Sequence, residues 1–230
     1  MNQKSPMLDP RLSLAFDLYD SCELAADIGT DHAHLPAALL QRGRCQHMIL
    51  TDNSEKALQN AENETTRFHL TDHVSLRLGF GLDPIHEKCD IISIMGMGGR
   101  TIRDILLRGK NHLQGASLLL SAHTDLPLIR SVVQQIGYYL EREEPCYAAD
   151  RYYLVLRARP GKRPMSDREV RLGGPLWNSD SPHLLPFLKR RRDVLYEQIK
   201  GISSASVPNR ELLAQLREDL DIYDYRLKNG

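Results

Sequence analysis

The sequence has few cysteines. Four are spread over 230 residues, at Cys22, Cys45, Cys89 and Cys146, and no two form a CxxC pair. Such scattered cysteines predict neither a disulfide framework nor a zinc knuckle. We therefore expect a protein of the reducing cytoplasm.

Long hydrophobic runs are also missing. No stretch approaches the roughly 20 apolar residues that a membrane-spanning helix needs. The opening MNQKSPMLDP lacks the apolar core of a secretory leader. The chain is thus expected to be soluble and to have no membrane partner.

The charge is balanced overall but not along the chain. Lys+Arg and Asp+Glu number 30 each, yet residues 1–150 hold 14 Lys+Arg against 20 Asp+Glu, and residues 151–230 hold 16 against 10. A local basic surface attracts phosphates whatever the total charge is. The asymmetry favours a polyanionic partner for the C-terminal part, although solvated helix faces would produce the same pattern.

Apolar segments alternate with helical ones over the first 137 residues. The expected strands cover 24–30, 47–53, 74–81, 89–99 and 115–123, and the expected helices cover 35–43, 54–68, 100–109 and 126–137. This alternation predicts βαβ units and a parallel sheet. Two further extended runs, 138–148 and 151–160, lie close together and predict an antiparallel hairpin beside it.

The pattern changes after residue 160. Residues 159–182 are rich in Pro, Gly and charge, which is typical of a boundary segment. Beyond them, leucines recur at steps of 3 and 4 on two helices separated by a turn at 201–209. We predict a first domain at 1–160 and a second unit at 161–230, made of a linker and a helical hairpin.

Polar residues crowd into the stretch AADIGTDHAHLP, residues 25–36, where a strand turns into a helix. Gly29 allows a ligand to approach the backbone, and Asp27 can meet a ligand's ammonium group. Asp52, after the second strand, is placed to accept both hydroxyls of a ribose. This loop lacks the G-x-G-x-x-G pattern that admits a pyrophosphate, and Asp31 would repel one. A carboxylate-rich loop suits the sulfonium of S-adenosylmethionine better than NAD.

Two motifs carry a family resemblance. ADIGTDHAHLP, followed by IMGMGG after the fourth strand and by a helical C-terminal extension, resembles the bacterial tRNA (adenine(22)-N(1))-methyltransferases. The resemblance implies an α/β fold, a Rossmann-like methyltransferase seven-stranded sheet with a small coiled-coil-like helical domain. It also implies S-adenosyl-L-methionine as cofactor and tRNA as substrate.

Carried over by motif, the resemblance implies a cofactor site and its border with the target base. The residues are Asp27, Gly29, Asp31, His32, Asp52, Phe80, Gly96, Met97 and Gly98. At two positions the chain departs from the family: GFGL has Phe80 where a polar residue is usual, and SAH has His123 in place of an asparagine-containing segment. Backbone contacts or stacking on Phe80 would then replace the missing polar contact.

Adenine N1 has an in-plane lone pair, so its methylation needs alignment instead of a strong base. The methylated ring is cationic, and we expect Asp27 or Asp31 to stabilise it as the catalytic carboxylate. No metal site is predicted, because Asp31, His32 and His34 have only His47 as a further histidine nearby.

Basic residues of the C-terminal part are the candidate tRNA contacts. Arg151 and the KRRR run Lys189, Arg190, Arg191 and Arg192 are expected to follow the phosphate backbone. Two alternatives remain at this point: a small-molecule methyltransferase, and a non-catalytic RNA-binding protein on a degenerate methyltransferase fold. The pattern carries no signal for the oligomeric state.

Overall fold

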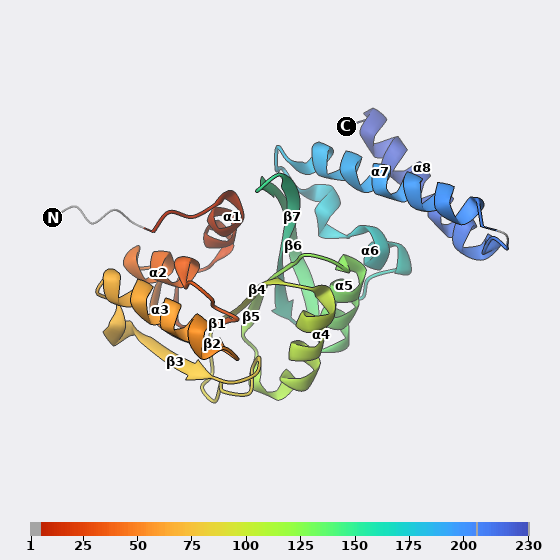
Figure 1. Ribbon diagram of the computed structural model, residues 1–230. Helices are drawn as coiled ribbons and strands as arrows, with labels where there is room; N and C mark the ends of the chain where they lie inside the picture. Colours follow the sequence, from red (N-terminus) through yellow and green to blue (C-terminus); the bar gives the residue numbers. More distant parts are fainter. Residues whose placement is uncertain (1–5, 206, 230) are drawn as a thin grey trace.

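The computed structural model describes residues 6–205 and 207–229. Residues 1–5, which belong to the opening segment considered in the sequence analysis, and residue 206 in the predicted 201–209 turn lie outside them. The strands are β1 (Cys22–Ile28), β2 (Cys45–Asp52), β3 (Val74–Leu78), β4 (Ile91–Met97), β5 (Ser117–Ala122), β6 (Tyr138–Ala148) and β7 (Arg151–Pro160). The α-helices are α1 (Pro10–Leu18), α2 (His34–Gln41), α3 (Glu55–Arg67), α4 (Gly99–Arg108), α5 (Leu126–Gln135), α6 (Asp167–Leu172), α7 (Leu184–Ser203) and α8 (Arg210–Asn229) (Figure 1).

The strands form one seven-stranded sheet in the order β3-β2-β1-β4-β5-β7-β6. The first five strands pair in parallel, and β7 runs antiparallel to both β5 and β6. The predicted fold class, including the terminal antiparallel hairpin, is confirmed.

Two hydrophobic cores lie on the two faces of this sheet. Ala26 and Ile28 of β1 join a core with the apolar residues of α4 and α5, whereas Ala25 joins a core with α1 and α2. Successive strand residues point to opposite faces, so a strand covered on both faces must be apolar throughout. This explains why the parallel strands were readable as continuous apolar segments.

Helix α1 is an element that the sequence analysis did not predict. Asp9 caps it by accepting a hydrogen bond from the Leu12 amide at 2.7 Å, and Pro10 occupies its first turn. Ala15 and Phe16 are buried, and the helix packs beside α2 and the β6–β7 hairpin. The start of α1 is thereby held near the carboxyl edge of the parallel strands.

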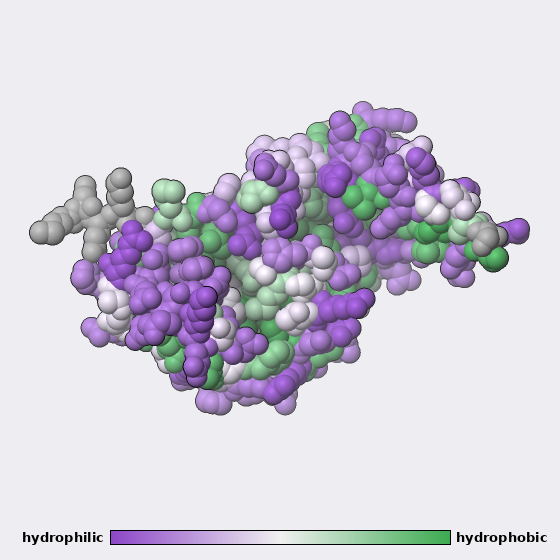
Figure 2. Space-filling view, in the orientation of Figure 1, coloured by the Kyte–Doolittle hydropathy of each residue, from purple (hydrophilic) through white to green (hydrophobic). Residues whose placement is uncertain are grey.

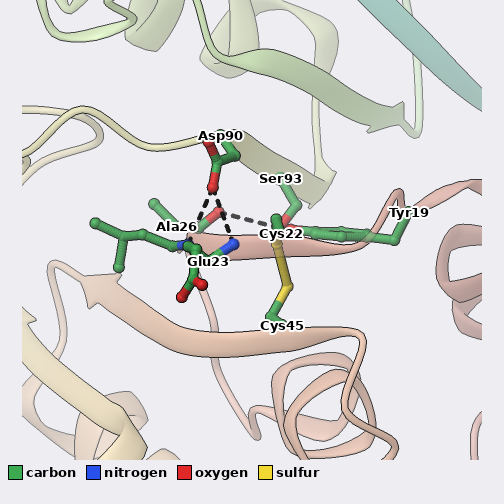
Figure 3. The surroundings of a disulfide bond; sticks show 8 residues. Tyr19, Cys22, Glu23, Ala26, Cys45, Asp90 and Ser93 are labelled. Carbon is green, nitrogen blue, oxygen red and sulfur yellow. Dashed lines mark hydrogen bonds between the residues drawn. A yellow bond between two sulfur atoms is a disulfide. The ribbon is translucent and has the colours of Figure 1, made fainter.

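Cys22 and Cys45 form a disulfide, which corrects the expectation of unpaired cysteines (Figure 3). The two residues are register partners at the starts of β1 and β2, although 23 positions separate them in sequence. They become neighbours only when the strands pair, so their spacing alone could not reveal the bond. Because it joins the amino ends of the strands, it lies at the opposite edge of the sheet from the predicted site.

The predicted boundary segment is fixed to the sheet by a buried ion pair. Arg130 of α5 donates from Nε to Glu143 Oε1 of β6 at 2.7 Å, and both side chains are almost fully buried. Arg130 also donates to the carbonyls of Val170 and Arg171, and Glu143 Oε2 accepts from the Gly174 amide at 3.1 Å. The backbone of the segment after residue 160 is therefore hydrogen-bonded to both members of the ion pair.

Helices α7 and α8 form the predicted hairpin, which extends away from the sheet (Figure 1). Leu188 and Leu195 of α7 and Tyr223 of α8 belong to the same core as α4 and α5. Arg171 of α6 also holds Asp219 of α8, with Nη2 2.9 Å from Oδ1. Because the core is continuous, the division into units 1–160 and 161–230 stays a prediction.

Candidate active site

A cleft of ≈ 370 Å³ opens at the carboxyl ends of β1 and β4. We call it the strand-end cleft, and its walls include Arg11, Asp27, Gly29, Gly96, His123 and Tyr153. Its volume lies in the range of about 300–1,000 Å³ that is usual for small-ligand sites. In Figure 2, hydrophilic side chains cover α2 and α3, and paler, less polar residues lie beside them, where the loops after β4 and β5 run.

The loop between β1 and α2 has an unusual backbone. Gly29, Asp31 and Ala33 have φ values of 72°, 46° and 50°, in the left-handed region. The φ of Gly29 favours glycine, and a Cβ there would lie 2.0 Å from the Met97 Cε, so the end of the Met97 side chain would have to move. Left-handed conformations cost about 1–3 kcal/mol at non-glycine residues and persist where the surroundings enforce them, often at functional sites.

Asp27 is the buried acid of the cleft, 7% exposed. Its Oδ1 accepts a hydrogen bond from Ser93 Oγ at 2.5 Å, and the Ser93 hydroxyl lies 3.0 Å from that of Tyr19. Figure 3 shows Tyr19 pointing toward Ser93. Since a carboxylate only accepts, Ser93 donates to Asp27 and Tyr19 donates to Ser93.

Burial raises the pKa of Asp27, and the nearby charge of Asp52 raises it further. The hydrogen bond from Ser93 and the charge of Arg11 act in the opposite direction. Burial also raises the pKa of Tyr19, so its hydroxyl stays a donor. The result is a costly negative charge, held in place by hydrogen bonds, that a cationic ligand would stabilise.

The other polar residues of the loop are less constrained. Asp31 is exposed, with Oδ1 3.7 Å from His32 Nε2. The His32 ring stacks on that of His34 with centroids 5.6 Å apart, and His34 Nδ1 lies 3.0 Å from Glu64 of α3. His34 therefore ties the loop to a neighbouring helix, and Asp31 and His32 are left facing the cleft.

Four of the predicted cofactor residues lie outside the walls of the strand-end cleft. The end of the Met97 side chain lies beside Gly29, and Gly98 is the N-cap residue of α4. Asp52 ends β2, where its Oδ1 accepts from the Ser54 amide at 3.0 Å and its carbonyl accepts from Gly79 at 2.9 Å. These contacts join Asp52 to the loop after β3 at the carboxyl end of β2, outside the walls of the strand-end cleft.

Phe80, in this loop, lines a separate shallow pocket with Asp83 and Glu87. The Arg108 guanidinium lies 5.1 Å from the centroid of its ring. Phe80 is 36% exposed, so part of its side chain is open to solvent. Its role at the cofactor stays a prediction.

Three residues of the cleft come from segments that the motifs did not mark. Arg11 is on α1, and its guanidinium lies 5.3 Å from the centroid of the Tyr153 ring on β7. His123, noted in the sequence only as a departure, follows β5 and meets Tyr153 edge-on at 5.8 Å. The Asp9-Pro10 helix start was the one local signal that could have revealed this side of the site.

The predicted tRNA contacts are not equivalent in the structure. Arg151 begins β7 with its guanidinium 5.9 Å from the Tyr153 centroid, and Lys189 and Arg190 are exposed on α7. Arg191 is half-buried beside Tyr223. Arg192 is bound by Asp193 at 2.6 Å and Asp224 at 3.5 Å. One arginine of the run is thus already neutralised by carboxylates.

Among residues 6–205 and 207–229, no group of three or more His, Cys, Asp or Glu side chains is arranged to hold a metal ion. No helix in the part of the chain that the structure describes is long and apolar enough to cross a membrane.

Comparisons with known proteins agree with this geometry. The sequence profile of the family described as "Methyltransferase domain" matches residues 8–156. A tRNA (adenine(22)-N(1))-methyltransferase of Bacillus subtilis (strain 168) is 27% identical, over 97% of this chain and 98% of its own length.

Solved structures are similar over almost the whole chain. A proposed tRNA (m1A22) methyltransferase of Streptococcus pneumoniae has a TM-score of 0.86 at 26% identity, with 96% of this chain and 100% of that chain covered. The same protein in complex with S-adenosyl-L-methionine has a TM-score of 0.84 at 25% identity, with the same coverage.

Proposed function

Because the chain belongs to the methyltransferase-domain family, we propose that it transfers a methyl group from S-adenosyl-L-methionine to N1 of adenine 22 in tRNA. The observation that carries the proposal is the place of the buried Asp27 carboxylate and the left-handed loop around Gly29, which lie at the carboxyl ends of the parallel strands. The chain that forms this site is similar over 97% of its length to an enzyme of this activity. We expect the protein to act in the cytoplasm, where its tRNA substrate is found.

The residues present fit this cofactor. The buried charge of Asp27 suits an ammonium group, and the absence of a side chain at Gly29 leaves the backbone approachable. Helix α2 begins in the cleft with no side-chain cap, so its amide groups are available to a carboxylate. We assign Asp52 to the ribose hydroxyls and Phe80 to the adenine side of the same ligand.

The protein's task in catalysis is mainly positional. When bound, S-adenosyl-L-methionine supplies an electrophilic methyl group on a positively charged sulfonium. Adenine N1 attacks with an in-plane lone pair, so the chain must orient the base and need not deprotonate it. We assign Gly96 and Met97 to the border between cofactor and base, with Gly98 fixing the start of α4 behind them.

Charge stabilisation is the second contribution. Methylation at N1 makes the adenine ring cationic, and a fixed negative charge nearby lowers the energy of that change. Asp27 is held by Ser93 and is fixed in place before substrate arrives, whereas Asp31 is exposed and lies near His32. We assign Asp27 the main electrostatic role and Asp31 a supporting one, with His32 at the rim.

The test is to incubate the purified chain with S-adenosyl-L-methionine and an unmodified tRNA transcript. We expect 1-methyladenosine by nucleoside mass spectrometry and a primer-extension stop at position 22, and neither product from a transcript with A22→G. Cofactor binding without tRNA methylation would favour a small-molecule methyltransferase. Failure to bind the cofactor by calorimetry would favour a non-catalytic RNA-binding protein.

A further inference from the structure

A second cleft, of ≈ 550 Å³, lies between the tip of the β6–β7 hairpin and α7. We call it the hairpin cleft; its walls include Tyr147, Arg151, Tyr152, Phe187, Arg190 and Arg191. His123 and Tyr153 line both this cleft and the strand-end cleft. The two clefts therefore meet at these two side chains, and a polymer with one unit in the first can place the next in the second.

Aromatic rings form the floor of the hairpin cleft. Tyr147 and Tyr152 are register partners across the hairpin, with ring centroids 4.9 Å apart. Tyr152 in turn meets Phe187 edge-on at 6.3 Å, and Phe187 is buried in the core. Tyr147 is nevertheless 41% exposed. A ring that is supported from below and open above is a platform on which a nucleobase stacks.

The backbone fixes this platform. Ala149 and Asp150 connect β6 to β7 and have φ values of 46° and 59°. Two successive left-handed residues make the tight two-residue turn that matches strand twist, although neither residue is the usual glycine or asparagine. The turn holds Tyr147 opposite Tyr152 and Ala148 opposite Arg151 on the two strands.

Free cations surround the aromatic floor. Among the described residues, the ion pairs include neither Arg151 nor Arg190, and Asp150 is the acidic side chain that lines the cleft. Arg157 and Arg159, lower on the same strand, are instead held by Asp20 and Glu141. Of the three arginines of β7, the one without a carboxylate partner among the described residues is thus the one beside the exposed ring, where a phosphate would be held.

We propose that the hairpin cleft is a subsite for a nucleotide adjacent to the methylated adenine, with its base on Tyr147 and its phosphate between Arg151 and Arg190. This inference rests on the proposed function, because it takes the target adenine to lie beside the cofactor at the strand-end cleft. When the adenine leaves its stack to expose N1, the adjacent nucleotide loses a stacking partner. The hairpin cleft binds this adjacent nucleotide and replaces the lost contact. Stacking accepts any base, so the subsite recognises RNA without reading its sequence.

The first measurement is tRNA affinity of the full-length protein by fluorescence anisotropy. We expect Tyr147→Ala to weaken tRNA binding by about 5- to 150-fold, the effect of losing one stacked base. Tyr147→Phe keeps the ring and should bind as the wild type does. Tyr225→Ala removes a tyrosine on α8 that is 72% exposed and outside the cleft, and it should have no effect. Calorimetry should show unchanged S-adenosyl-L-methionine affinity in all three.

The second measurement places 2-aminopurine at position 21 or 23 of the tRNA. Stacking on Tyr147 should quench its fluorescence at one of these positions with the wild type and the Phe variant, but not with Tyr147→Ala. Suppose that the wild-type protein methylates A22. If Tyr147→Ala then binds tRNA as tightly as the wild type, or quenches 2-aminopurine to the same extent, the subsite is overturned and the proposed function still stands. Absence of A22 methylation by the wild type would instead overturn the proposed function.

Discussion

The strand-end cleft and the hairpin cleft share two side chains but hold their charges in different ways. Asp27 in the first is buried and receives a hydrogen bond from Ser93, whereas Arg190 in the second is exposed. A buried, hydrogen-bonded charge fixes one small ligand in one orientation. Exposed arginines attract a large polyanion from a distance and tolerate variation in its approach. Under the proposed function, the chemical step and the capture of tRNA are therefore expected at separate parts of one sheet edge.

The origin of the two clefts differs as well. The strand-end cleft is built mainly from a contiguous loop, residues 27–36, and from the end of β4. The hairpin cleft combines the tip of β6–β7 with one face of α7, more than 30 residues further along the chain. Its shape therefore depends on how firmly the segment after residue 160 is anchored.

The largest effect is expected from breaking that anchor with Glu143→Gln. The substitution leaves the Arg130 guanidinium buried without an opposite charge, which typically costs about 3–5 kcal/mol. Urea denaturation should show a loss of this size in the free energy of unfolding. Protection from proteolysis should fall first in the segment 161–183, and tRNA affinity should fall with it.

A matched control replaces both partners, as Arg130→Met with Glu143→Leu. Apolar residues in place of a buried pair remove the unpaired charge, so part of the stability should return, while the Val170 and Arg171 carbonyls and the Gly174 amide lose their partners. A Glu143→Gln protein within 0.5 kcal/mol of the wild type would contradict the role of the pair as an anchor.

The next largest effect is expected from Asp27→Asn, which tests the strand-end cleft alone. The charge opposite the methylated ring is lost while the shape is kept, so the turnover number should fall on the order of 10²–10³-fold, as when one preorganised electrostatic contact is removed. Single-turnover methylation assays measure this directly. Affinity for tRNA should stay near the wild-type value, because the cations of the hairpin cleft are intact.

The same variant has an opposite effect on stability. Burial raises the folded-state pKa of Asp27 above its unfolded value of 3.8, so the folded state binds the proton more tightly. Wild-type stability from this group is fully present below pH 3.8 and is lost as pH rises through the folded-state pKa. The stability of Asp27→Asn relative to wild type should therefore increase over that pH range and level off above it. A thermal midpoint that falls at neutral pH would argue against a costly buried charge.

The parallel half of the fold was predictable because its central strands are mainly apolar on both faces and end in turn residues, while the edge strand β3 alternates apolar and polar residues. Asp27, Gly29 and Asp31, which line the strand-end cleft, could be predicted to lie together because they are close in sequence within a single loop. The nine-residue helix α1 was missed because so short a segment is helical mainly through the burial of Ala15 and Phe16 against other elements. With it went Arg11.

Contacts between distant segments account for the other omissions. Tyr153 lies on a strand that local pattern predicts well, but its place in the site depends on the antiparallel pairing of β7 with β5 and β6. The Cys22–Cys45 bond likewise depends on strand register. The KRRR run shows the same limit, because sequence gives four equal charges and only tertiary packing separates Arg192, with its aspartates, from Arg190.

A smaller effect, on one ligand only, is expected from Asp52→Ala. If this carboxylate accepts hydrogen bonds from a ribose, its loss removes an interaction of about 1.5–3 kcal/mol, or roughly 10- to 150-fold in cofactor affinity. Calorimetry with S-adenosyl-L-methionine measures the change. The tRNA affinity should not change, since Asp52 is not among the residues that line the hairpin cleft. An unchanged cofactor affinity would remove Asp52 from the site.

The smallest effect separates the four charges of the KRRR run, and it tests whether the hairpin cleft or the whole helix meets RNA. Arg190→Gln with Arg191→Gln removes the two that line the cleft, while Lys189→Gln with Arg192→Gln removes the two that do not. Glutamine keeps helix propensity, so the comparison isolates charge. Each lost phosphate contact lowers the slope of log affinity against log salt by about 0.7–0.9. We therefore expect the first pair to reduce the slope by roughly one to two units and the second to leave it unchanged. Equal reductions by the two pairs would mean that RNA contacts α7 along its surface, outside the cleft.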